Sequence, residues 1–121
     1  MSDWLFSKNG QAEILLDGDC FRSDRGDVVA WIREPHVYSL NGNHIGWFEN
    51  GVLYDSNNQA LGFLRGATGS VPGRPGLGGT PGKPGSGGRP GKPGFGGVPG
   101  KPGRGGWSGI DLGDYFSQAQ Y

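Results

Sequence analysis

Short apolar or aromatic runs alternate with glycine- and asparagine-containing turns from Trp4 to Arg65. This alternation is typical of an antiparallel β meander, and helical spacing of apolar residues is absent there. Asn-Gly and Asp-Gly pairs between the runs tolerate positive φ, and Pro35 removes a ladder donor. The pattern predicts eight strands, which are Trp4–Ser7, Ala12–Leu16, Cys20–Ser23, Val28–Arg33, Val37–Leu40, His44–Glu49, Val52–Asp55 and Ala60–Arg65.

The predicted strands also repeat. Ala30-Trp31-Ile32, Gly46-Trp47-Phe48 and Gly62-Phe63-Leu64 share the order small, aromatic, apolar at spacings of 16 residues. A weaker copy, Glu13-Ile14-Leu15, lies 17 residues before the first of them. The repeated unit is one β-hairpin, and because a single hairpin cannot bury a face alone, four of them must stack or close around an axis.

Three runs resemble the bacterial four-fold β-flower family: Val37-Tyr38-Ser39-Leu40-Asn41-Gly42, Ile45-Gly46-Trp47-Phe48-Glu49-Asn50-Gly51-Val52-Leu53-Tyr54-Asp55, and Leu61-Gly62-Phe63. The resemblance covers about residues 1–66. It implies a small all-β domain built by symmetric association, with no catalytic residue to transfer. It leaves open whether the four-fold character belongs to the hairpins of one chain or to four chains around an axis.

A glycine-rich tract follows, and it repeats with two periods. Its four units are VPGRPGLGG, TPGKPGSGG, RPGKPGFGG and VPGKPGRGG, over residues 71–106. Glycine occupies every third position: Gly73, Gly76, Gly79, Gly82, Gly85, Gly88, Gly91, Gly94, Gly97, Gly100, Gly103 and Gly106. The tract therefore resembles collagen, where three polyproline II strands leave room only for a hydrogen at the axis.

This tract favours an ordered polyproline II assembly over a solvated linker, because a linker has no reason to keep glycine in phase. Fully extended, it would reach on the order of 110 Å. All eight prolines take the Y position of Gly-X-Y, but the other Y positions are glycine, at Gly78, Gly87, Gly96 and Gly105. A triple helix would therefore be marginal unless its ends are clamped, and a polyproline II bundle or a disordered tract stays open.

The last residues supply a candidate clamp. Trp107, Tyr115 and Phe116, with Ile110 and Leu112, form an acidic aromatic patch that is too short to fold alone. Burial of each large side chain is worth roughly 1.5–3 kcal/mol, so we expect the patch to dock. Its partner is the chain's own head, a neighbour's head or another copy of the patch; the alternative is a frayed end.

The chain is thus expected to have a β-hairpin head at 1–66, a collagen-like segment at 67–106 and an aromatic anchor at 107–121. With 121 residues and the single cysteine Cys20, it has little core and no internal disulfide, so self-association is the expected supplement. The formal net charge is zero. Residues 1–70 nevertheless carry −4, and residues 71–106 carry +6, from Arg74, Lys83, Arg89, Lys92, Lys101 and Arg104.

Residues suited to catalysis or metal binding are sparse. His36 and His44 are the only histidines, no carboxylate cluster joins them at ligand spacing, and we interpret them as surface or turn residues. Cys20 is expected to be buried in a strand. The pairs Asp17/Asp19 and Asp24/Asp27 flank turns, where Asp is favoured for local hydrogen bonds. We predict no catalytic residue, no metal and no cofactor.

The sequence therefore predicts a non-enzymatic structural protein that self-assembles as a trimer, a tetramer or a filament. The assembly residues would be the twelve periodic glycines with Trp107, Tyr115 and Phe116. The alternative is sequence-independent binding of nucleic acid or another polyanion through the six basic residues, although the tract contains one aromatic, Phe95. We identify no small-molecule substrate and no membrane segment. Met1–Gly10 lacks a signal-peptide pattern, and the compartment stays open.

Overall fold

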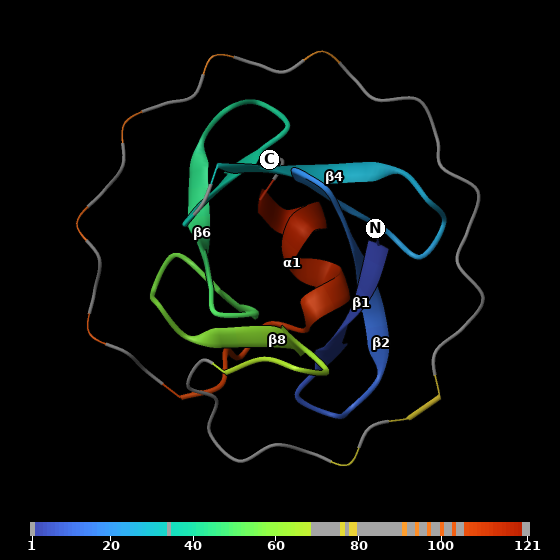
Figure 1. Ribbon diagram of the computed structural model, residues 1–121. Coiled ribbons are helices and arrows are strands. Elements are labelled where there is room, and N and C mark those ends of the chain that lie inside the picture. Colours follow the sequence, from blue (N-terminus) through green and yellow to red (C-terminus); the bar gives the residue numbers. More distant parts are fainter. Residues whose placement is uncertain are drawn as a thin grey trace.

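A computed structural model describes residues 2–33, 35–68, 76, 78–79, 91, 94, 97, 100, 103 and 106–119. In this described part, eight antiparallel strands form a closed barrel in which each strand pairs with the next and β8 pairs with β1 (Figure 1). The strands are β1 (Ser2–Ser7), β2 (Ala12–Asp17), β3 (Cys20–Arg22), β4 (Val28–Arg33), β5 (His36–Ser39), β6 (His44–Glu49), β7 (Val52–Tyr54) and β8 (Ala60–Leu64). The predicted all-β fold of four hairpins is confirmed, with strand ends differing by one or two residues.

The four-fold repeat lies within one chain. Four hairpin turns begin at Ser7, Ser23, Ser39 and Asp55, sixteen residues apart. In each turn the amide of the first residue donates to the carbonyl four residues later, at 2.8–2.9 Å. Its carbonyl accepts from the amide three residues later, at 2.9–3.0 Å. The fourth residue of every turn has positive φ, which explains three glycines and one asparagine: Gly10, Gly26, Gly42 and Asn58.

The strand register corrects one copy of the repeat. Cys20 pairs with Trp31 between β3 and β4, and Trp4 pairs with Leu15 between β1 and β2. Leu15 is therefore the equivalent of Trp31, and the fourth copy is Ile14-Leu15-Leu16 at the same spacing of sixteen. The expected copy one residue earlier was wrong, because the aromatic position that marks the other copies is a leucine here.

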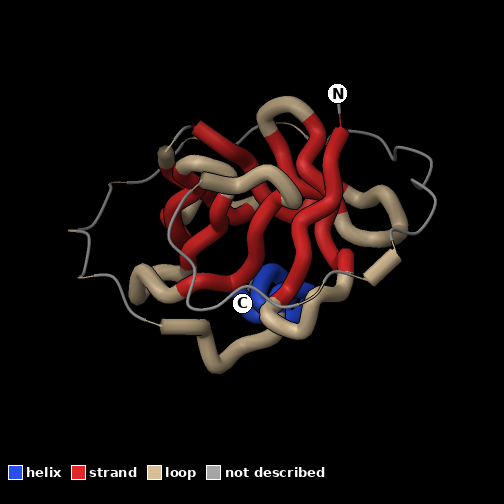
Figure 2. The backbone as a smooth tube through the Cα atoms, turned by 60° about the horizontal axis from the view of Figure 1, so that its bottom comes forward, coloured by secondary structure: helices blue, strands red, loops and turns tan. Residues whose placement is uncertain are grey.

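The interior of the barrel holds the main core. Side chains from all four hairpins line it, including Leu5, Ile14, Phe21, Val37 and Leu53. Helix α1 (Leu112–Ala119) completes this core, and the sequence pattern did not predict it. Figure 1 looks along the barrel with α1 inside the ring of strands, and in Figure 2 the helix lies at one end of the barrel. Across the described residues, no helix has the length and apolar character needed to cross a membrane.

Two strand glycines are fixed by close backbone approach. A Cβ at Gly46 in β6 would overlap the carbonyl oxygen of Tyr54. A Cβ at Gly62 in β8 would lie 2.7 Å from Leu112 Cδ2 and 2.9 Å from the carbonyl oxygen of Phe6. The absence of a side chain at Gly46 therefore lets β6 lie close to the backbone at Tyr54. At Gly62 it lets Leu112 of α1 lie close to β8.

We predict that Gly46→Ala lowers the free energy of unfolding by roughly 1–3 kcal/mol, because backbone atoms must move to admit the methyl group. Urea denaturation measures the change. Gly109→Ala is the matched control, since a Cβ there has nothing within 4 Å. A Gly46→Ala protein as stable as Gly109→Ala would contradict the close approach.

Candidate assembly site

The C-terminal aromatic patch docks on the chain's own barrel. Leu112, Tyr115 and Phe116 stand at positions i, i+3 and i+4 of α1, so they share one helix face. Leu112 is 1% and Phe116 2% exposed, and the ring of Phe116 lies 5.8 Å from that of Phe21. The sequence left open whether the patch docks on the chain's own head, on a neighbour's head or on another copy of the patch. In the structure it docks on the chain's own head.

The hydroxyl of Tyr115 ties the helix to the barrel wall. It accepts a hydrogen bond from the amide of Ser56 at 3.1 Å and donates to the carbonyl of Ile45. Burial of the side chain is the main cause that raises the pKa of Tyr115 above its usual 10.0. Docking of the helix therefore favours the neutral form of the Tyr115 side chain.

The residues just before α1 add a short strand-like contact. Trp107 forms a parallel bridge with Ala60, whose amide donates to Gly106 at 3.0 Å and whose carbonyl accepts from Ser108 at 2.8 Å. The ring of Trp107 lies 6.1 Å from that of Phe63. The tail is thus held on β8 before it enters the barrel.

Asp55 connects the fourth hairpin turn to this tail. One of its oxygens accepts from the amides of Asn57 and Gln59, both at 2.9 Å, as expected for an Asp that closes its own turn. The other accepts from the hydroxyl of Ser108 at 2.7 Å, in a buried contact. The equivalent residues Ser7, Ser23 and Ser39 lack the second oxygen, so the repeat departs from symmetry where the tail docks.

The described glycines of the three-residue period lie in open space. At these positions, a Cβ would have no neighbour within 4 Å, and φ is outside the positive range: Gly76, Gly79, Gly91, Gly94, Gly97, Gly100, Gly103 and Gly106. Gly78 donates to the carbonyl of Gly10 at 2.8 Å. The other periodic glycines and the six basic residues of the tract lie outside the described residues.

The two histidines are closer than the sequence suggested. They lie on β5 and β6 rather than in turns, half-buried, with His36 Nδ1 at 3.2 Å from His44 Nε2. The ring of His44 also lies 4.7 Å from that of Trp47. Burial, followed by the nearby His36, lowers the pKa of His44. No group of three or more metal-ligating side chains occurs among the described residues.

The remaining candidates for chemistry have local structural contacts. Cys20 is fully buried in β3, as the sequence predicts, and its thiol donates to the carbonyl of Asp17 at 3.2 Å. Asp17 also pairs with the buried Arg22, at 2.7 Å. Arg22 donates to the carbonyl of Gly26 at 2.7 Å, so this ion pair links two adjacent turns.

We predict that Asp55→Ser loosens the tail while keeping the turn, because serine closes the three equivalent turns. Losing a buried hydrogen bond to a carboxylate costs about 1.5–3 kcal/mol. Hydrogen exchange of the α1 amides and urea denaturation measure the loss. Ser108→Ala should cause at least this loss, because its hydroxyl also accepts from the amide of Ile110. Adding Asp55→Ser to Ser108→Ala should change little further; additive losses would contradict a direct bond.

We also predict that docking weakens in alkali. The pKa of Tyr115 is raised in the folded chain, so this stabilisation is fully present below pH 10.0 and declines as the pH rises through the raised value. Urea denaturation from pH 8 to 11.5 should show a steeper loss for the native protein than for Tyr115→Phe. Parallel curves for the two proteins would contradict the prediction.

Comparison with known proteins gives one family. The family model described as "4-fold beta flower protein" matches residues 3–116, from the first strand into helix α1. No curated protein and no solved structure matches the chain. Because the match includes the barrel, the tract and most of the helix, the chain belongs to the 4-fold beta flower family.

Proposed function

We propose that this chain is a non-enzymatic structural protein that self-associates through its glycine and proline tract. Family membership indicates a small structural domain. The barrel and its docked helix would serve as a rigid base, and the tract would be the part that contacts other copies. Assembly of many copies would produce an oligomer or a filament.

The observation that supports self-association is the open space around the periodic glycines. Glycine is needed where φ is positive or where another atom lies too close for a side chain. At the eight described positions, neither condition holds with respect to the part of the chain that the structure describes. A requirement for glycine at every third residue would therefore come from neighbouring backbones of other copies.

The two anchored ends decide which assembly this geometry favours. Thr68 donates to the carbonyl of Asn50, and Gly106 accepts from Ala60, so both ends are held near the β7–β8 hairpin. A straight rod of about 110 Å cannot start and finish on one hairpin. While the helix stays docked, side-by-side packing of loops is favoured over a full-length triple helix.

The non-enzymatic assignment is supported by the occupied interior. Some small barrels bind a ligand in their interior. Here the side chains of Leu112 and Phe116 from α1 fill the interior. Described side chains that could take part in catalysis, such as those of Cys20 and Asp55, form structural hydrogen bonds instead.

We predict that Gly97→Ala reduces self-association and that Gly96→Ala does not. Both changes add one methyl group to the same stretch, but only Gly97 stands in the three-residue period. Light scattering across a concentration series, with circular dichroism for the polyproline II signal, measures the effect. Equal behaviour of the two variants would contradict packing of the tract.

Binding of polyanions through the six basic residues is the second candidate, supported by their charge of +6 without an acid in the tract. Fluorescence anisotropy with a single-stranded oligonucleotide tests it. Binding that falls steeply with salt would support it, and absence of binding at low salt would remove it.

A further inference from the structure

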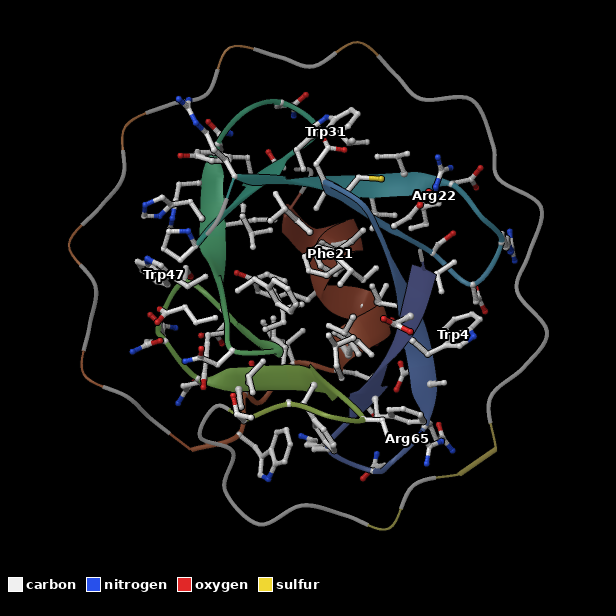
Figure 3. All side chains as sticks on the ribbon, in the orientation of Figure 1. Trp4, Phe21, Arg22, Trp31, Trp47 and Arg65 are labelled. Atoms are coloured by element: carbon white, nitrogen blue, oxygen red, sulfur yellow. The ribbon has the colours of Figure 1, made fainter. Side chains whose placement is uncertain are left out.

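The barrel has a cleft where its first and last strands meet. The cleft has a volume of about 580 Å³, within the usual size of ligand sites, and Trp4, Phe6, Leu64, Arg65 and Thr68 contribute to its lining. Figure 3 shows Trp4 of β1 and Arg65, just after β8, on the same side of the barrel. This position is a seam, because everywhere else the chain continues from one strand of the described barrel directly into the next.

The lining of the cleft includes two aromatic rings and one buried donor that has no acceptor among the described residues. Trp4 is 6% exposed, and its Nε1 has no hydrogen-bond partner among the described residues. The guanidinium of Arg65 lies 5.2 Å from the centre of the Phe6 ring, and Asp3 adds an exposed carboxylate to the lining. A buried indole N–H needs an acceptor, and an occupant of the cleft would bring one.

The tract offers a matching ligand. Every nine-residue unit contains the spacing Pro-x-x-Pro, as in Pro90-Gly-Lys-Pro93. A polyproline II strand makes no internal hydrogen bonds, so its carbonyls remain free as acceptors. Such strands are recognised by aromatic grooves. Each unit also carries a basic residue beside proline, which suits the carboxylate of Asp3.

We propose that the cleft at the β1–β8 seam binds one Pro-x-x-Pro unit from the tract of a second copy of this chain. This inference rests on the proposed function and supplies a site for it. Trp4 Nε1 donates to a carbonyl of the strand, the ring of Trp4 contacts a proline, and Asp3 faces the lysine or arginine, while Arg65 stays over the buried Phe6 ring.

A second copy is the favoured occupant for two reasons. Thr68 lines the cleft, so the chain's own tract begins there, and Gly78 in its first unit is already bonded to Gly10 in another turn. Each chain also has four units for this one cleft. The surplus units allow one chain to contact several others, as growth of an assembly requires.

A peptide titration tests the site on the full-length protein, at dilutions where light scattering gives a monomer. The probe is RPGKPGFGGVPGKPG, residues 89–103, and the control is the same peptide with its four prolines replaced by alanine. The indole N–H resonance of Trp4, assigned with Trp4→Phe, should shift saturably with the probe only. No shift, or an equal shift with the control peptide, overturns the proposal.

Two variants connect the site to assembly. Trp4→Phe keeps an aromatic ring and should weaken peptide binding roughly fivefold, by loss of one hydrogen bond. Asp3→Asn, a nearly isosteric change at an exposed position, should weaken binding of the basic probe most at low salt. Both should lower the mean mass at high concentration.

The outcomes separate this inference from the proposed function. If Gly97→Ala disperses the assembly while Trp4→Phe and Asp3→Asn do not, the tract associates but the cleft is not its site, and the inference fails alone. If the peptide binds but Trp4→Phe leaves assembly unchanged, the occupant is the chain's own tract, and the second copy is excluded.

Discussion

Burial of Leu112, Tyr115 and Phe116 inside the barrel is the contact on which the other features of the chain depend. A helix of eight residues is too short to persist in water, so α1 exists because the barrel interior receives it. The interior, in turn, depends on these side chains to complete its packing. Since the tail returns to the barrel that precedes it, the long tract between them is a loop with two fixed ends.

The four-fold repeat shows where the chain departs from symmetry. Ser7, Ser23 and Ser39 close their turns in the same way, and Asp55 closes the fourth turn and also holds Ser108. Gly62 makes room for Leu112, whereas Ile14 and Ala30 fill two of the three equivalent positions and the third, Gly46, approaches Tyr54 instead. The seam beside Trp4 is the third departure. Each one lies where the barrel meets the tail or where its ends join.

Much of the barrel could be predicted from the sequence, because turn chemistry and alternation are local. Asn and Gly at positions of positive φ fixed where strands end, and the family resemblance fixed the fold class. The helix was missed because its apolar spacing at Leu112, Tyr115 and Phe116 covers little more than one turn, and its stability comes from distant strands. The contact between His36 and His44 likewise depends on cross-strand register, which composition does not reveal.

The loop has one more consequence, which concerns its length. In the described part of the chain, the tract touches the barrel at Gly78 and at its two ends, and the strand register does not pass through it. Whole nine-residue units could therefore be gained or lost without shifting a single barrel residue. Repeat number could then change without altering the fold, and in the proposed assembly it would set how far apart two joined barrels stand.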